Sequence, residues 1–183
     1  VYKSQSSFAA QPSRNYKLSV LTSNGNEYGS TEMQLTQPTT INNLYAERDF
    51  NENGNEGVSM YIDSYDPTGN SKYYRHEYEE TYKIVAPFWS PRDFVITNDS
   101  YPWAHELQLK TTEQQTCYNS VKSNNIIQTQ TTNLSEDKVS KFAVRFIPKN
   151  NPIISHRYSI FVKQYVQSLE AHTYYKTLDK FAG

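Results

Sequence analysis

The sequence predicts a mainly β protein, an antiparallel β-sandwich-type domain with one C-terminal helix. Three observations point to this class. Apolar and polar residues alternate with period two in several segments, which is typical of half-buried strands. One segment, near the end, carries an apolar stripe at helical spacing. The chain has 16 tyrosines while only 36% of its residues are hydrophobic, a composition that favours sheets with one wet face over helical bundles.

The first predicted element is a hairpin across residues 15–35. Residues 16–22 alternate, with tyrosine, leucine and valine on one face of a strand. Asn24-Gly25 follows, a dipeptide that favours a type I′ turn. Pro38 then interrupts the extended pattern, because proline cannot donate to a strand ladder. We therefore place a candidate domain boundary after residue 37.

The next segment predicts a loop, a strand and a turn in that order. The polar run 49–57 predicts the loop. Val58, Met60 and Ile62 alternate as the inward residues of a strand. Residues 66–70 (Asp-Pro-Thr-Gly-Asn) predict the turn, because proline presets φ and glycine accepts a positive φ.

Residues 73–85 carry two competing patterns. Tyr74, Tyr78 and Tyr82 are spaced by four residues, which a helix accepts. Alternation is nearly complete over the same segment, however, and it favours a strand whose tyrosine face points into the core. Glu80 lies on this face, and we expect it to accept hydrogen bonds from tyrosine hydroxyls in a buried network.

Two later strands and the helix complete the predicted fold. Residues 142–147 predict one strand, and residues 157–166 show the clearest alternation in the chain. Ser168 is suited to cap a helix over 169–180. The apolar stripe of this helix is formed by Ala171, Tyr174, Tyr175, Leu178 and Phe181. We expect this stripe and residues 158–162 to pack against the tyrosine face of residues 73–85.

An aromatic, proline-punctuated loop is predicted for residues 86–105, and it is the best candidate for a partner or ligand site. Phe88, Trp89, Tyr101 and Trp103 lie in it, and aromatic residues dominate interface hot spots. A competing interpretation is that the two tryptophans only cap the open end of the sandwich. A stacking platform for sugars or bases would show the same residues, and the absence of a basic field makes bases the weaker of these two alternatives.

Composition and charge argue against several function classes. The formal net charge is −1, so no positive field attracts nucleic acid. No apolar run approaches the length of a membrane-spanning helix. The single cysteine, Cys117, is interpreted as a small buried hydrophobe. The four histidines lack metal-ligand spacing, and no nucleophile elbow or glycine-rich phosphate loop occurs. We therefore expect a non-enzymatic protein without a cofactor.

A weak calcium-loop candidate lies in the polar run before Val58. Asp49, Asn51 and Asn53 match the first ligands of an EF-hand-type loop. Met60 occupies the twelfth position, where a bidentate glutamate is expected. A solvated polar turn is therefore the favoured interpretation.

Two tyrosine-rich motifs resemble signatures of a large uncharacterised family of Bacteroidota surface lipoproteins. They are the run 72–82 (KYYRHEYEETY) and the run 157–165 (RYSIFVKQY), the second followed by the helix that begins near Ser168. Cys117-Tyr118 resembles the family's Cys-aromatic pair between them. His76 departs from the pattern, since the family usually has another aromatic residue there.

The resemblance implies both an architecture and a role. Members carry a lipid-anchored N-terminus and an immunoglobulin-like or transthyretin-like sandwich before this region. Residues 1–37 are then the last strands of that sandwich, and residues 38–183 are a second β-rich domain, incomplete at its C-terminus. The genes commonly lie beside TonB-dependent outer-membrane transporters.

The implied protein is a non-enzymatic accessory lipoprotein of the outer membrane at the cell surface. It associates with a TonB-dependent transporter, a β-barrel, and helps to capture or retain its substrate. Its contact with the membrane is only through a lipid anchor outside this segment. The alternative is a stand-alone surface protein that binds a peptide, a glycan or a metal complex.

Overall fold

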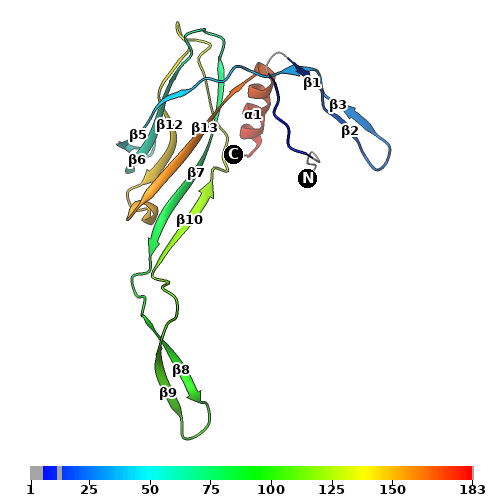
Figure 1. The fold of residues 1–183 in the computed structure, drawn as a ribbon. Coiled ribbons are helices and arrows are strands. Elements are labelled where there is room, and N and C mark those ends of the chain that lie inside the picture. The colour runs from blue at the N-terminus through cyan, green and yellow to red at the C-terminus, as the bar shows by residue number, and fades with distance from the viewer. Residues whose placement is uncertain (1–5, 12–13, 183) are drawn as a thin grey trace.

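The computed structural model describes residues 6–11 and 14–182, and Figure 1 shows a β-rich body from which a long arm projects. The first strands are β1 (Asn15–Tyr16), β2 (Ser19–Leu21), β3 (Glu27–Gly29), β4 (Met33–Gln34), β5 (Ile41–Phe50), β6 (Glu56–Tyr65) and β7 (Tyr73–Val85). They are followed by β8 (Arg92–Asn98), β9 (Ala104–Leu109), β10 (Thr116–Lys122), β11 (Ile127–Gln130), β12 (Lys138–Pro148), a 3₁₀ turn η1 (Pro152–Ile154), β13 (Tyr158–Gln167) and α1 (Leu169–Ala182).

Two antiparallel sheets form the body, as the sequence predicts. One sheet has the order β12-β6-β5. The other is built around β7, which pairs with β13 along one edge and with β10 and β11 along successive parts of the other. β7 is therefore the central strand, which agrees with its being the longest alternating segment of the chain.

The hydrophobic core lies between these two sheets. Met60 and Ile62 of β6 and Val144 of β12 face Tyr78 of β7 and Val162 of β13. The predicted inward positions of β6 are confirmed, as are those of Tyr74 and Tyr78 in β7, whereas Tyr82 is only half-buried and lies outside the core cluster. Residues 158–162 are not in a layer that faces β7, however, because Val162 is the cross-strand partner of Tyr78 in the same sheet.

A partly buried ion pair, in which the carboxylate is buried and the guanidinium half-buried, joins the two sheets. Arg145 of β12 donates from Nε and from Nη2 to the carboxylate of Glu80, both at 3.1 Å. The Tyr158 hydroxyl donates to Glu80 Oε2 at 2.8 Å, which confirms the predicted tyrosine bond. Burial, and then the hydrogen bond to Glu80, raise the pKa of Tyr158 above its usual value. Each of the three side chains therefore provides a hydrogen-bond partner for a polar or charged neighbour whose burial without a partner would be costly.

The final helix packs against the outer face of the β7 sheet, not against the tyrosine face that the sequence predicts. His172 lies 5.0 Å from the ring of Tyr73, and Tyr175 stacks over the guanidinium of Arg75. Tyr174 and Phe181 stay exposed. The opposite sheet of the sandwich already covers the tyrosine face. The helix therefore packs on the other face of β7, which carries the odd-numbered residues. Its predicted start is confirmed, since Ser168 Oγ accepts from the Ala171 amide at 3.2 Å.

Several strands form where the sequence shows no clear alternation. β5 is an edge strand with mostly exposed residues, so it lacks a buried face to reveal it. The polar loop predicted at 49–57 is shorter in the structure. Only residues 51–55 form a turn, and the residues on either side belong to β5 and β6. β10 likewise has exposed residues on both faces and lies in a polar segment.

The N-terminal region forms two small ladders, β1 with β4 and β2 with β3. The predicted hairpin is present, but its turn is not type I′. φ is positive at Gly25 (84°) and not at Asn24, and the Gly25 amide donates to the Thr22 carbonyl at 2.9 Å. A type I′ turn would require positive φ at both central residues.

Candidate functional site

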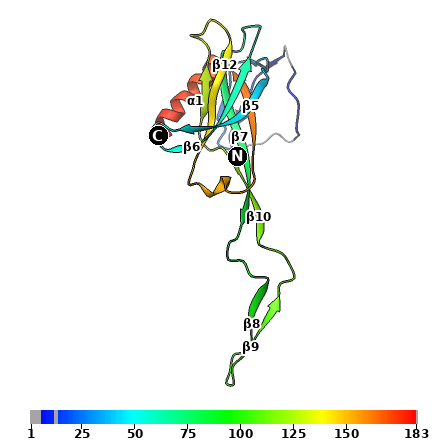
Figure 2. The ribbon, with the colours of Figure 1, turned by 90° about the vertical axis from the view of Figure 1, so that its left-hand side faces the viewer.

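The clearest candidate site is the arm formed by β8 and β9, which Figures 1 and 2 show projecting far from the sandwich. The two strands pair antiparallel with each other and, among the described elements, with no other strand. At about 3.4 Å per residue, their six paired positions span roughly 20 Å. Since no second layer covers this ribbon, both of its faces are open to solvent.

One face of the arm is apolar. Phe94 pairs with Leu107, and Ile96 and Leu109 lie on the same face. These four side chains are 59–71% exposed. The opposite face carries Asp93, Gln108 and Glu106 with one apolar residue, Val95, and Asp93 forms a salt bridge with Lys110 at 3.3 Å. The face of Phe94 also carries Arg92 and the ring of His105, which stacks on Phe94 at 4.8 Å. The arm is thus an amphipathic ribbon whose mainly apolar face is covered by no other described element.

The four predicted binding aromatics do not form one cluster. Phe88 and Trp89 lie at the base, between β7 and β8, whereas Tyr101 and Trp103 lie at the tip, between β8 and β9. Phe88, Tyr101 and Trp103 are exposed. Trp89 is half-buried, and Lys110 Nζ lies 5.6 Å from the centroid of its ring. The two tryptophans therefore do not cap the open end of the sandwich together.

The sequence predicts a loop for residues 86–105, and this prediction is wrong. These residues contain all of β8 and the start of β9. The signal was the alternation of Phe94 with Ile96 and of Leu107 with Leu109. The prolines at 87, 91 and 102 obscure it, although they lie outside the two strands.

A family model described as Domain of unknown function (DUF4249) matches residues 1–182. The chain belongs to the DUF4249 family. This confirms the resemblance to an uncharacterised family. Comparison with curated proteins finds no match, and comparison with solved structures finds none either.

Two of the three glutamates of β7, Glu77 and Glu80, are bound into the fold of this DUF4249 chain. Glu80 is held by Arg145 and Tyr158, as described above. Glu77 Oε1 accepts from Arg75 at 2.6 Å and its Oε2 accepts from the Tyr165 hydroxyl at 3.1 Å. Burial alone would raise the pKa of Glu77, but the hydrogen bonds from Arg75 and Tyr165 and the charge of Arg75 outweigh it, so this pKa is lowered. Both carboxylates have protein partners, so their geometry is that of a structural network.

The calcium-loop candidates have protein partners too. The carboxylate of Asp49 accepts from Ser59 and Tyr61, and these bonds lower its pKa. Asn51 Oδ1 accepts from the amides of Asn53 and Asn55 at 3.1 and 2.8 Å, which is a turn-forming pattern. Within residues 6–11 and 14–182, no group of three or more His, Cys, Asp or Glu side chains is arranged to hold a metal ion.

The structure bears on two further expectations, the burial of Cys117 and the presence of a membrane-spanning helix. Cys117 is a free, exposed thiol on β10, so its interpretation as a buried hydrophobe is wrong. β10 pairs with β7 on one side only, and its side chains face solvent. In the described part of the chain, no helix has the length and apolarity needed to cross a membrane.

Proposed function

We propose that this DUF4249 chain is a non-enzymatic docking module that binds another protein through the apolar face of its arm. The complete molecule is then an accessory lipoprotein at the cell surface, anchored by lipid in the outer membrane. Its partner is a TonB-dependent transporter, whose substrate it helps to capture or retain.

The observation that carries the proposal is the exposed face of Phe94, Ile96, Leu107 and Leu109. Full burial of one such side chain contributes about 1.5–3 kcal/mol. In the sandwich such residues are covered by the opposite sheet, whereas on the arm they are 59–71% exposed. An exposed apolar patch with a polar rim is characteristic of a protein–protein contact.

The shape of the arm also favours a protein partner. A two-stranded ribbon keeps free amide and carbonyl groups along both outer edges, which can pair with a strand of a partner. Tyr101 and Trp103 are exposed at the tip, and they are residue types that anchor interfaces. The choice of a TonB-dependent barrel rests on the resemblance of the two tyrosine-rich motifs.

The proposal is tested by affinity purification of the full-length protein from outer membranes of its native host. Leu107→Asp places a charge on the apolar face of β9, and Gln108→Asp places the same charge on the opposite face. We expect a β-barrel transporter to copurify with the wild type and with Gln108→Asp in fixed stoichiometry, and to be lost with Leu107→Asp.

Two outcomes would contradict the proposal. If no barrel copurifies with the wild type, the transporter partner is wrong, and the stand-alone ligand-binding alternative gains support. If a barrel copurifies equally with both variants, the partner is right but the arm is not its docking site. Equal melting temperatures of the two variants ensure that the comparison concerns binding and not folding.

A further inference from the structure

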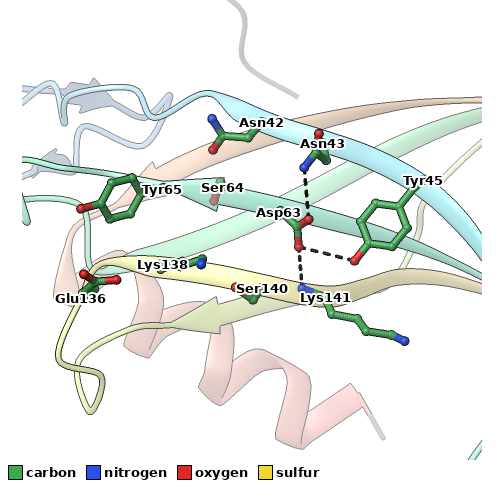
Figure 3. A pocket seen from close by; sticks show the side chains of 10 residues that line it. All are labelled: Asn42, Asn43, Tyr45, Asp63, Ser64, Tyr65, Glu136, Lys138, Ser140 and Lys141. Atoms are coloured by element: carbon green, nitrogen blue, oxygen red, sulfur yellow. Dashed lines mark hydrogen bonds between the residues drawn. The ribbon is translucent and has the colours of Figure 1, made fainter.

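A second feature, away from the arm, is an open pocket of about 690 Å³ on the outer face of the β12-β6-β5 sheet. Figure 3 shows Asp63 of β6 at its centre, with Tyr45 of β5 on one side and Tyr65 of β6 on the other. The third wall is the segment of β12 around Lys141. Three strands of one sheet therefore supply the pocket, which places its floor on a rigid element.

The lining of the pocket is polar and aromatic. It contains amide, hydroxyl, carboxylate and amine groups and two tyrosine rings, and no aliphatic side chain. The two acidic residues are Asp63 and Glu136, and the two basic residues are Lys138 and Lys141. Lys141 Nζ is 2.5 Å from Glu47 outside the pocket, so its charge is already paired. The pocket therefore has no excess of positive charge to select an anion.

A backbone irregularity shapes the floor. β12 has a register shift between Val139 and Phe142, and Lys141 within it has a φ of 48°. This conformation directs the Lys141 amide to Asp63 Oδ1 at 2.7 Å. The carboxylate is thus fixed in position, yet it keeps acceptor capacity, since a carboxylate has about four lone-pair sites.

The other contacts of Asp63 are long. The Tyr45 hydroxyl is 3.5 Å from Oδ1, and Asn43 Nδ2 is 3.4 Å from Oδ2. Both distances lie at the weak end of hydrogen bonding. Burial, followed by the nearby Asp63 and Glu47 carboxylates, raises the pKa of Tyr45, so its hydroxyl keeps its proton as a donor. A ligand hydroxyl, which both donates and accepts, suits the gap between these groups.

We propose that this pocket binds a neutral glycan unit. The amide of Asn43, the carboxylate of Asp63 and the phenol of Tyr45 hydrogen-bond its hydroxyls, and the exposed ring of Tyr65 stacks on its C–H face. An apolar ligand would leave the polar lining unsatisfied. A metal ion would need more carboxylate, histidine or thiol ligands than the described residues gather here.

The test is a glycan array that carries neutral and acidic oligosaccharides, probed with the full-length protein bearing a dye on Cys117. This thiol is exposed on β10, in the other sheet, so the dye leaves the pocket free. We expect binding to a set of neutral glycans. Tyr65→Ala should lower the affinity for the best of them about tenfold, as measured by calorimetry.

Tyr118→Ala is the matched control, because Tyr118 is also an exposed tyrosine but lies on β10. It should leave the affinity unchanged. Asn43→Ala provides a second pocket variant that removes a hydrogen bond and not a ring. The proposal is overturned if no neutral glycan binds, if only acidic glycans bind, or if binding survives both pocket variants. Leu107→Asp on the arm should retain glycan binding, so failure here is distinct from failure of the docking proposal.

Discussion

The guanidinium of Arg75 lies 4.7 Å from the ring centroid of Tyr175, and this contact joins the helix to the sheet. The same guanidinium also lies 4.9 Å from the ring centroid of Tyr165 in β13. Glu77 holds Arg75 from a third direction, at 2.6 Å. The cation therefore contacts two aromatic rings, one from the sheet and one from the helix.

Replacing Tyr175 with alanine should loosen the helix without unfolding the sandwich. A cation–π contact of this kind contributes about 0.5–2 kcal/mol. We expect faster amide hydrogen exchange throughout α1 and a loss of stability on the order of 1–2 kcal/mol. Phe181→Ala is the control, since Phe181 is an exposed aromatic on the same helix. Equal effects of the two variants would contradict the role of the Arg75 contact.

His76 should make the protein less stable in mild acid. Burial lowers its pKa below the usual 6.5, while its ring nitrogen Nε2 lies 2.9 Å from Gln164 Oε1. Between the lowered pKa and 6.5, the unfolded chain binds a proton that the folded chain does not. Stability should therefore be full above about pH 6.5 and fall as the pH drops through that window.

The measurement for His76 is the melting temperature between pH 7.5 and pH 5. His76→Gln keeps a hydrogen-bond donor but does not titrate, so it should flatten this dependence. Some slope should remain, because burial also lowers the pKa of His172. An unchanged slope in His76→Gln would rule out His76 as a source of the acid sensitivity.

The ion pair between Glu80 and Arg145 predicts strongly non-additive mutations. Glu80→Ala leaves the guanidinium and the Tyr158 hydroxyl without their acceptor, which should cost about 3–5 kcal/mol of unfolding free energy. Arg145→Met in the same background removes the uncompensated charge and should recover part of this loss. Urea denaturation of the two single variants and the double variant checks the prediction. Additive losses would show that the pair is not coupled.

Core and arm aromatics should respond differently to truncation. Tyr78 is buried between the sheets, so Tyr78→Ala should destabilise the protein by about 3–5 kcal/mol, by analogy with Phe→Ala in cores. Trp103 is 73% exposed at the tip of the arm, so Trp103→Ala should leave the melting temperature unchanged and weaken copurification of the partner. If Tyr78→Ala left the melting temperature unchanged and abolished copurification, while Trp103→Ala destabilised the protein, the assignment of Tyr78 to the core and Trp103 to binding would be wrong.

The parts of the fold that the sequence predicts are those with one buried and one wet face. Tyr74, His76, Tyr78 and Glu80 alternate because the opposite sheet covers that side of β7. The edge strand β5 has no such contrast, and alternation cannot reveal it. The stripe of α1 predicts a helix but not the sheet face it covers, because a contact such as Arg75 with Tyr175 does not register as hydrophobicity.

The candidate sites were predicted only in part, for a related reason. The aromatic composition of residues 88–103 marks the arm as unusual, and its tip residues Tyr101 and Trp103 are indeed exposed. The apolar face of Phe94 and Leu107 was missed because prolines at 87, 91 and 102 flank the two strands and obscure their alternation. The pocket at Asp63 depends on a register shift in β12, more than seventy residues away along the chain, which no local pattern reports.

The arm has a mechanical consequence, because it continues from β7 and β10. The ladder between these strands reaches Val85 and Thr116, directly before the linkers to the arm. Figure 1 shows the arm running on in roughly the direction of β7. Ladder hydrogen bonds are perpendicular to the strands. A pull on the tip along the arm draws β7 and β10 in the same direction, so the load passes to the ladder between β7 and β13 and acts on its hydrogen bonds in shear. A bound partner can therefore exert tension on the core sheet without unzipping it bond by bond.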